Sequence, residues 1–261
     1  MEATFHGNGF APHRHDTYAL GLTLSGVQTF HYRGEDRFSR PGNVIVLHPD
    51  ERHDGAAGTE DGLRYRMLYL PPELLQQAGP QGATALPFVP APVLKDDTLA
   101  ATLADALGDL DQEPDALAVD DLLAQVADGL WRHADDRRTP IRADARQGLW
   151  ACRDHLHAHC TETVTSTELE AVSGLDRYTL ARQFRILFGT SPHRYQVMRR
   201  LDRARAGLAG GEELAAAAFD AGFADQAHFT RHFKSAFGMT PGRWRALSRA
   251  GRPSETVGAP R

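Results

Sequence analysis

The sequence contains one sixteen-residue motif twice, at a constant offset of 49 residues. The first copy is LARQFRILFGTSPHRY, residues 180–195, and the second is FTRHFKSAFGMTPGRW, residues 229–244. In each copy, large apolar residues recur at every fourth position, which places them on one face of a helix. A glycine then ends the helix, and Ser-Pro or Thr-Pro begins the next helix as its N-cap and first residue.

A short apolar helix and a glycine-containing turn precede each copy, with Gly174-Leu175 before the first and Gly222-Phe223 before the second. Helix, tight turn and helix is the pattern of a helix-turn-helix unit. A single copy could equally be an ordinary helical hairpin whose phenylalanines fill a core. The repetition favours a DNA reader, because basic residues recur opposite the phenylalanines, where they can contact phosphates and bases. These pairs are Arg182 and Arg231, Arg185 and Lys234, and Arg194 and Arg243.

Charge is divided unevenly between the two halves of the chain. Residues 139–261 contain 18 Lys and Arg against 12 Asp and Glu, whereas residues 1–138 contain 11 against 22. The overall formal charge of −5 therefore combines a basic C-terminal half with an acidic N-terminal half. Such asymmetry indicates nucleic-acid binding by the basic half, while DNA phosphates would repel the acidic one.

The length of 261 residues allows two ordinary domains, each with its own core. The sequence has no run of about 18 apolar residues, and its first residues do not form a basic segment followed by an apolar one. We therefore expect neither a membrane span nor a secretory signal. The two cysteines, Cys152 and Cys160, would be about 12 Å apart on a helix, too far for a disulfide. A reducing cytoplasm fits this sequence.

Residues from about 8 to 70 show the pattern of short β-strands. Runs of β-branched, aromatic and leucine residues alternate with Gly, Pro and Asp turn signals, which suggests a small antiparallel barrel or sandwich. The predicted strands cover residues 18–24, 27–32, 44–47 and 65–69. Two helical patterns follow a proline-rich loop, the first through Leu99, Leu103, Leu107 and Leu110, and the second through Leu122, Val126 and Leu130.

The C-terminal hundred or so residues resemble the DNA-binding domain of the AraC/XylS family of bacterial transcription regulators. The stretch that carries the resemblance runs from Gly222-Phe223 through Phe229, Phe233 and Phe237-Gly238 to Thr240-Pro241. The resemblance implies two helix-turn-helix units joined by a long helix, about residues 192–209, so that both recognition helices enter successive major grooves on one face of DNA. The DNA-contacting residues it implies are Arg177, Tyr178, Thr179, Arg182 and Arg185 in the first unit, and Gln226, His228, Arg231 and Lys234 in the second.

Ala181 and Ala227 stand at base-facing positions where members of that family often carry longer polar side chains. An alanine offers only a methyl contact to a base. Base reading by the first unit is therefore expected to depend largely on Arg182.

The N-terminal half resembles the cupin-type sensor domain attached to many of these regulators. The matching residues are His13-Arg14-His15, Gly26, Pro41-Gly42 and the segment from Pro49 to His53. Cupin enzymes hold a metal with two histidines of a His-x-His motif, a glutamate and a later histidine. The resemblance makes His13, His15 and His53 weak metal-ligand candidates, and three imidazoles alone can hold Zn²⁺. Ala19 stands in the glutamate position, so we expect neither a metal nor a cofactor.

The mouth of a barrel is a common place for a small molecule to bind. The ligand-contacting residues expected there are His13, His15, Tyr18, His53, Tyr65 and Arg66. Such a set of His, Tyr and Arg side chains suits a small polar or anionic metabolite better than a lipid.

The predicted fold class is α+β, with an N-terminal cupin-like β-barrel and a helical hairpin followed by an all-α domain with two helix-turn-helix units joined by a long helix. We expect a sensor barrel at 1–95, a helical dimerisation or docking segment and linker at 96–138, a DNA-binding domain at 139–249 and a disordered tail at 250–261. The expected function is that of a cytoplasmic, ligand-responsive, sequence-specific transcription regulator and not of an enzyme. Its expected partners are double-stranded DNA, a small-molecule effector, RNA polymerase and a second copy of the chain, with no membrane.

Two other functions stay open. A cupin-type metalloenzyme with a helical appendage would need the glutamate that Ala19 replaces, and it would leave the doubled basic motif unexplained. A constitutive DNA-binding activator, whose barrel serves only assembly, is excluded by nothing in the sequence.

Overall fold

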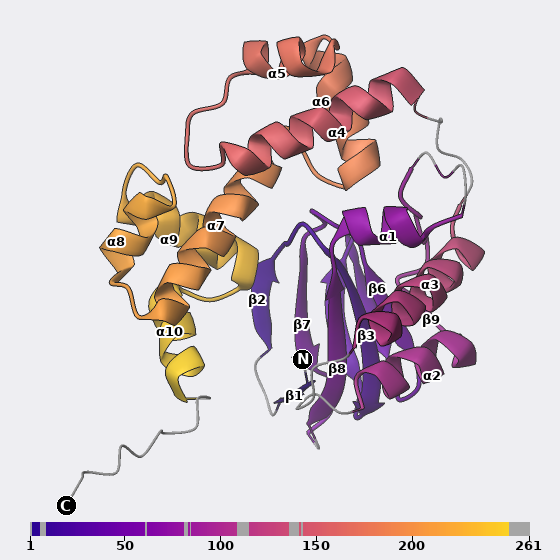
Figure 1. The fold of residues 1–261 in the computed structure, drawn as a ribbon. Helices are drawn as coiled ribbons and strands as arrows, with labels where there is room; N and C mark the ends of the chain where they lie inside the picture. Colours follow the sequence, from indigo (N-terminus) through magenta and orange to yellow (C-terminus); the bar gives the residue numbers. More distant parts are fainter. Residues whose placement is uncertain are drawn as a thin grey trace, which may run out of the picture.

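The computed structural model describes residues 2–5, 9–60, 62–80, 83, 85–108, 115–135, 141 and 143–250 (Figure 1). Its N-terminal part contains two antiparallel sheets, with strand orders β1-β8-β3-β6-β9 and β2-β7-β4-β5. The five-stranded sheet consists of β1 (Glu2–Phe5), β8 (Leu63–Leu70), β3 (Tyr18–Ser25), β6 (Val44–Leu47) and β9 (Val93–Leu94). The four-stranded sheet consists of β2 (Phe10–His13), β7 (His53–Ala57), β4 (Gln28–Tyr32) and β5 (Glu35–Ser39).

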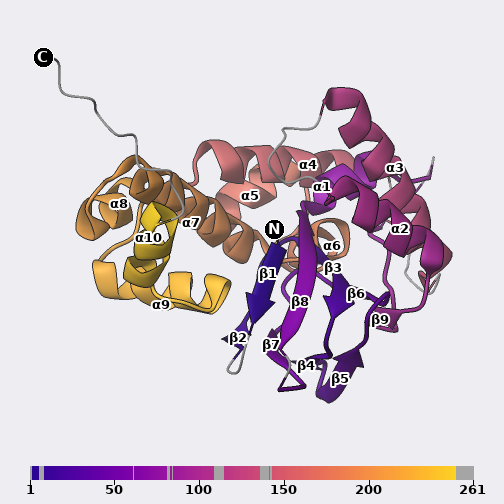
Figure 2. The same cartoon turned by 90° about the horizontal axis from the view of Figure 1, so that it is seen from below.

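The two sheets face each other across an apolar core (Figure 2). Successive side chains of a strand point to opposite faces, so Ala19, Ile45 and Met67 of the five-stranded sheet meet Phe30 and Tyr32 of the other sheet. The predicted cupin-like barrel is thus present as two facing sheets and not as one closed ring. Side chains of the chain itself fill the space between the sheets.

Three helices cover the outer face of the five-stranded sheet (Figure 1): α1 (Pro72–Ala78), α2 (Asp97–Ala106) and α3 (Ala116–Arg132). Leu20 and Val46 of the sheet share one buried cluster with Leu99 of α2 and Leu130 of α3. Burial on both faces explains why β3 is almost continuously apolar. The leucines of the two predicted helical patterns therefore pack α2 and α3 on the sheet of the same chain. Leu110, the last residue of the first pattern, lies outside the described residues.

Asp96 joins the beginning of α2 to the end of α3. Its carboxylate accepts a hydrogen bond from the backbone N–H of Leu99 at 2.9 Å, and it pairs with Arg132 at 3.0 Å and with His133 at 2.8 Å. Burial opposes ionisation, but these three donors outweigh it and lower the pKa of Asp96 to about 2. The carboxylate is therefore ionised at neutral pH.

The C-terminal part consists of two three-helix units joined by a long helix (Figure 1). The first unit comprises α4 (Ala143–Ala158), α5 (Ser166–Ser173) and α6 (Arg177–Phe188), and the second comprises α8 (Leu214–Asp220), α9 (Gln226–Phe237) and α10 (Pro241–Ala250). The joining helix is α7 (Pro192–Gly210), close to the predicted range of 192–209. Phe184 and Phe188 lie in the core of the first unit, and Phe229 and Phe233 lie in the core of the second.

The glycine and proline signals of the repeated motif act as predicted. Gly189 and Gly238 end α6 and α9 with φ values of 73° and 68°, a left-handed conformation that favours glycine. Ser191 then caps α7 with its side chain, and Pro192 occupies the first turn. The predicted tail at 250–261 begins one residue too early, because α10 extends to Ala250. Residues 251–261, and residues 136–140 where the predicted linker meets the DNA-binding domain, lie outside the described residues. None of the described helices combines the length and apolar character needed to cross a membrane.

Candidate DNA-binding surface and effector site

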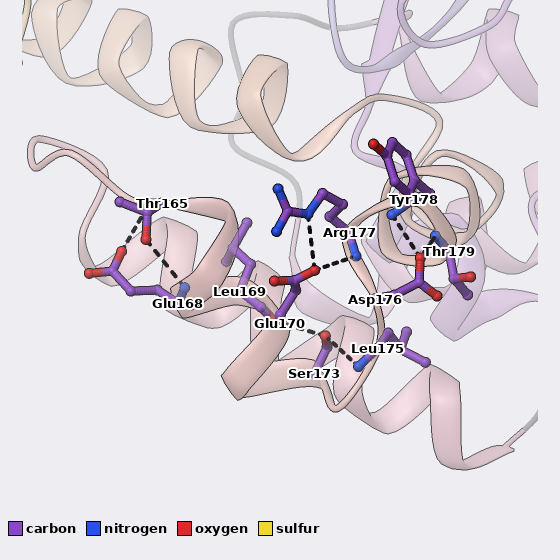
Figure 3. Close-up of polar contacts among 10 residues, drawn as sticks. All are labelled: Thr165, Glu168, Leu169, Glu170, Ser173, Leu175, Asp176, Arg177, Tyr178 and Thr179. Atoms are coloured by element: carbon purple, nitrogen blue, oxygen red, sulfur yellow. Dashed lines mark hydrogen bonds and ion pairs between the residues drawn. The ribbon is translucent and has the colours of Figure 1, made fainter.

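Side-chain hydrogen bonds hold the beginning of α5 and the turn that follows it in the first helix-turn-helix unit (Figure 3). Thr165 and Glu168 form a capping box at the start of α5, in which each side chain accepts a hydrogen bond from the backbone N–H of the other. In the turn, the hydroxyl of Ser173 accepts a hydrogen bond from the N–H of Leu175 at 3.1 Å.

Two carboxylates hold the beginning of α6 (Figure 3). Asp176 accepts hydrogen bonds from the N–H groups of Tyr178 and Thr179, at 3.0 and 3.1 Å. Glu170 of α5 accepts from the backbone N–H of Arg177 at 2.8 Å and from its Nε at 3.3 Å. Side chains of the turn therefore set the direction of α6 relative to α5, and a binding residue is placed more accurately on such a supported helix than on a free loop.

The exposed face of α6 carries the residues predicted to contact DNA in the first unit. Tyr178 is 73% exposed, and Arg177, Arg182 and Arg185 are exposed as well. Thr179 is half-buried, and its hydroxyl accepts a hydrogen bond from Nη2 of Arg182 at 3.4 Å. Four of the five predicted side chains of the first unit are therefore exposed on α6, and the fifth is half-buried.

The second unit presents an equivalent face on α9, where Gln226, Arg231 and Lys234 are exposed. His228 is held differently, because its Nε2 lies 2.9 Å from Nε2 of His232. One of these two imidazoles must donate and the other must accept. Burial and the neighbouring His228 lower the pKa of His232 to about 4, so that ring is neutral at physiological pH.

Three sensor histidines come together where β2 pairs with β7. Ring centroids lie 4.5 Å apart for His13 and His53, 4.9 Å for His15 and His53, and 6.2 Å for His13 and His15. Each Nδ1 atom lies 2.9, 2.8 or 3.0 Å from a backbone carbonyl oxygen, for His13, His15 and His53 respectively. Nε2 of His15 is buried and has no hydrogen-bond partner among the described residues.

The environment of this histidine cluster favours neutral rings. Burial lowers the pKa of His15 well below its ordinary value, lowers that of His53 to about 4, and also lowers that of His13. Ala19, at the position of the cupin glutamate, is buried in the core between the sheets. Among the described residues, no three or more His, Cys, Asp or Glu side chains are grouped so as to hold a metal ion. That the sensor carries no metal or cofactor stays a prediction.

The other predicted ligand residues lie apart from the histidine cluster. Tyr65 is buried in the core between the sheets. Arg66 donates to two carbonyl oxygens near the end of α2, each at 3.4 Å, and so it faces the covering helices. Tyr18 also faces outward, and its hydroxyl donates to the carbonyl oxygen of Pro87 at 2.7 Å.

Ion pairs that the sequence did not reveal join the sensor to α7. Nε of Arg194 lies 2.7 Å from Oδ1 of Asp50, and a guanidinium nitrogen of Arg14 lies 3.6 Å from the same oxygen. Further along α7, Arg199 pairs with Asp16. The basic residue Arg194 of the repeated motif therefore contacts the sensor.

Both recognition helices also lie beside the sensor. α9 is next to β2 (Figure 1), and the backbone N–H of Arg14 donates to the carbonyl oxygen of Ser235 at 3.0 Å. Arg231 and Lys234 line a groove whose other wall includes His13. A cavity of about 500 Å³ lies between the sensor and α6, where Arg182 and Arg185 face Tyr18, His48 and Phe88.

Two family descriptions match separate parts of the chain: an AraC-like ligand binding domain at residues 1–127 and a helix-turn-helix domain at residues 169–247. The chain belongs to the AraC family of transcription regulators. It is 27% identical over 223 residues to the uncharacterized HTH-type transcriptional regulator YbfI of Bacillus subtilis (strain 168), covering 84% of this chain and 81% of YbfI. It is 24% identical over 256 residues to the HTH-type transcriptional activator RhaS of Yersinia pestis bv. Antiqua (strain Angola), covering 92% and 91% of the two chains.

The fold also resembles that of ToxT from Vibrio cholerae O395, with a TM-score of 0.67 at 12% identity over 97% of this chain and 98% of ToxT. ToxT from Vibrio cholerae strain SCE256 with an unsaturated fatty acid bound gives a TM-score of 0.64 at 14% identity, over 94% and 92% of the two chains. These likenesses confirm the α+β fold. Together, the family matches identify this AraC-family chain as a ligand-responsive, DNA-binding transcription regulator, as predicted.

Proposed function

We propose that this AraC-family regulator lays α6 and α9 in successive major grooves on one face of DNA, while an effector bound to its N-terminal part sets its DNA affinity. The repeated basic face carries this proposal. Arg182 and Arg231 occupy equivalent positions on α6 and α9, as do Arg185 and Lys234, and α7 joins the two units. Paired recognition helices at fixed separation are the arrangement that DNA-binding proteins use to read neighbouring groove segments.

We assign Arg182 and Arg231 to base edges, and Arg185 and Lys234 to phosphates. Base contacts specify a sequence, whereas phosphate contacts position the protein on the duplex. The remaining predicted residues lie near the first turns of the two helices and would complete each contact surface: Arg177, Tyr178 and Thr179 on α6, and Gln226 and His228 on α9.

We propose RNA polymerase as a further partner, which the likeness to the activator RhaS supports. We also propose a homodimer, because dimers bind two-fold operators, and Leu117 of α3 is 78% exposed.

We propose that the domains end at residues 95, 138 and 249, as expected from the sequence, with α2 and α3 of the middle segment docked on the sensor. A transcription regulator of this family would act in the bacterial cytoplasm, where the DNA is.

We propose that the chain is not an enzyme, since its relatives are regulators and Ala19 replaces the carboxylate of a cupin metal site.

The second alternative, a constitutive DNA-binding activator whose N-terminal part serves only assembly, is favoured over the enzyme by one observation. Side chains such as Phe30, Tyr32 and Met67 fill the space between the sheets, where a sensor barrel would hold its effector.

The proposal is tested by selecting binding sites for the full-length protein from a random double-stranded library. We expect two conserved elements about one helical turn, roughly 10–10.5 base pairs, apart. Affinity for the selected site should fall linearly with salt on logarithmic axes, because phosphate contacts release counterions. Binding without sequence preference, or without salt dependence, would contradict the proposal.

A further inference from the structure

We propose that His232 of α9 is a positioning residue, which holds the imidazole of His228 so that His228 donates a hydrogen bond to a guanine. The inference rests on the proposed function, because it concerns how α9 reads DNA. His228 lies in the first turn of α9, and His232 follows one turn later on the same side of the helix. Both line a groove with Arg231, the side chain proposed to read a base in the same unit.

The backbone and the ring of His228 are both held in place. Its backbone N–H donates to Oδ1 of Asp225, the N-cap of α9, at 2.6 Å. Nε2 of its ring lies 2.9 Å from Nε2 of His232, and the two rings are inclined by 78° with centroids 4.5 Å apart. Phe223, in the core of the second unit, lies beside both rings, at centroid distances of 5.7 and 6.1 Å. A side chain ordered in this way before binding loses little entropy when it meets a base.

The surroundings of His232 decide which of the two rings takes up an added proton. Burial is the largest cause that lowers the pKa of His232 to about 4, and the neighbouring His228 is the next. Nearby basic groups act in the same direction, namely Arg194 and His193 of α7 and Arg231 of α9. His232 therefore stays neutral when His228 is protonated, and its Nε2 then accepts the hydrogen bond while its own proton is on Nδ1.

A protonated His228 has a second N–H to offer to DNA. Arg194 and Arg231 line the same groove, and none of the described residues that line it has a carboxylate. The phosphates of DNA are therefore the anions that neutralise an added proton here. With Nε2–H donated to His232, the Nδ1–H is left for a base. Guanine presents two adjacent acceptors, N7 and O6, in the major groove, whereas adenine has a donor beside its N7, so this N–H suits guanine.

The first unit has no such pair of rings. At the offset of 49 residues, Thr179 and Gln183 of α6 occupy the positions of His228 and His232. The hydroxyl of Thr179 accepts a hydrogen bond from Nη2 of Arg182 at 3.4 Å. The two units therefore differ at this position, and we expect the proton-dependent guanine contact in only one of the two elements of the DNA site.

The test compares the affinities of the full-length protein for the selected site and for its single-base variants, by fluorescence anisotropy at about pH 6 and about pH 8, which bracket the ordinary titration of imidazoles. We expect one G·C pair, in the element affected by Arg231→Ala, whose replacement weakens binding about tenfold at the lower pH and about threefold or less at the higher. His228→Ala should remove this dependence on pH. The measured quantity is the ratio of two affinities at one pH, because partial unfolding of a variant lowers both affinities alike.

Two variants of His232 separate positioning from stability. His232→Gln keeps an acceptor for Nε2–H and should keep the guanine preference within about twofold, whereas His232→Leu has no acceptor and should lower it about fivefold at the lower pH. His159→Leu is the matched control. His155 of α4 and His159, just past its end, are also four residues apart with ring centroids at 4.5 Å, and no DNA contact is assigned to them. This change should leave the preference unaltered.

Three results would overturn the proposal: an equal guanine preference at both pH values, an unchanged preference in His232→Leu, or the same loss in His232→Gln and His232→Leu. In each of them the protein still selects a site in a salt-dependent manner, so the proposed function stands. A protein that selects no site contradicts the proposed function itself, and this inference with it.

Discussion

Arg194, in the first turn of α7, forms an ion pair with Asp50 of the sensor, with Nε 2.7 Å from Oδ1. The two side chains are only 18% and 14% exposed. Because α7 joins the two helix-turn-helix units, a contact at its first turn sets the position of both units relative to the sensor. This one ion pair therefore links the sensor to both recognition helices.

Breaking that ion pair should strengthen DNA binding. In the structure the sensor lies beside the faces of α6 and α9 that DNA would contact. Asp50→Asn removes the charge that holds Arg194 and Arg14, so the sensor should leave these faces more often. We expect about fivefold tighter binding to the selected site without effector, or about 1 kcal/mol, measured by fluorescence anisotropy.

Asp36→Asn is the control for this change. Asp36 pairs with His31 on the four-stranded sheet, its side chain is 80% exposed, and it contributes to none of the ion pairs with α7. Its substitution should leave DNA affinity unchanged. An equal affinity for Asp50→Asn and the unaltered protein would show that the ion pair does not restrain the DNA-binding part.

Gly189 offers a second test of the contact between the sensor and the DNA-binding part. A Cβ at this position would lie 2.6 Å from Cβ of Pro49, which belongs to the sensor. Gly174, in the turn of the same unit, has a similar φ of 69° against 73°, but a Cβ there would meet nothing within 4 Å. The two glycines thus share a backbone conformation and differ in their neighbours.

Both Gly174→Ala and Gly189→Ala should cost about 1 kcal/mol of unfolding free energy, because alanine is strained at positive φ. Only Gly189→Ala should also separate the sensor from α6. Because α7 connects the two units, the contact of the sensor with α9 should loosen as well, and we expect faster hydrogen exchange in Gly189→Ala alone at the Arg14 amide, which donates to Ser235 of α9. Equal exchange in the two variants would mean that the interface does not depend on this close packing.

The elements that sequence patterns predicted are those whose side chains alternate or repeat. β3, β4, β6 and β8 were found because apolar residues mark them, and the helix-turn-helix units were found because the motif occurs twice. The strands β5 (EDRFS) and β7 (HDGAA) carry no such pattern. Their pairing depends on backbone hydrogen bonds to β4 and β2, which leave little trace in composition.

The residues of the candidate sites likewise fall into those that a local sequence pattern predicts and those that it does not. The exposed faces of α6 and α9 follow from helical period, so their residues could be predicted. The pairing of Asp50 with Arg194 joins loop and helix residues 144 positions apart, and no local pattern indicates it. Of the residues that line the cavity, the sequence indicated Tyr18 as a ligand contact and Arg182 and Arg185 as DNA contacts. Arg33, His48 and Phe88 were missed, because they come from separate segments that only the fold brings together.

The ionised Asp96 should stabilise the sensor in a pH-dependent manner. Its pKa in the folded chain is about 2, below the ordinary value near 3.9 for an unfolded chain. Its stabilisation is therefore complete above the ordinary pKa and is lost as the pH falls toward 2. Asp96→Asn keeps an N-cap oxygen but removes the charge, and it should cost about 1–2 kcal/mol at pH 7.

Thermal or urea unfolding of the Asp96→Asn variant and the unaltered chain from pH 7 to pH 2 measures this effect. The difference in unfolding free energy should be constant above about pH 5, should shrink steadily as the pH falls below about 4, and should be mostly lost at pH 2. A difference that does not change with pH would show that the charge of Asp96 is not what stabilises the contact between α2 and α3.

Protein purified without added metal should contain well under one equivalent of Zn, Fe or Mn by elemental analysis, and it should lack dioxygenase and isomerase activity. The histidine cluster offers neutral imidazoles, but Ala19 supplies no anionic ligand to offset the charge of a divalent ion. Stoichiometric metal that is lost in a His15→Ala, His53→Ala double variant would contradict this and revive the metalloenzyme alternative.

Arg231 and Lys234 should contribute to DNA binding in different ways. They lie on the same exposed face of α9, two positions before and one position after the buried Phe233. Arg231→Ala should cost about 1–3 kcal/mol and relax discrimination at one base position, because a bidentate contact to a base edge is lost. Lys234→Ala should weaken binding to all sequences alike and reduce the salt slope by about 1, because one phosphate contact is lost.

The measurement is the affinity of each variant for the selected site and its single-base variants, at several salt concentrations. Gln183→Ala provides a control, since Gln183 is a half-buried residue of α6 to which no DNA contact is assigned. The base-reading and phosphate-binding roles separate only if Arg231→Ala changes the pattern of preferred bases and Lys234→Ala does not. If both variants weakened every sequence equally, the assignment of Arg231 to a base, and with it that of Arg182 at the equivalent position on α6, would be wrong.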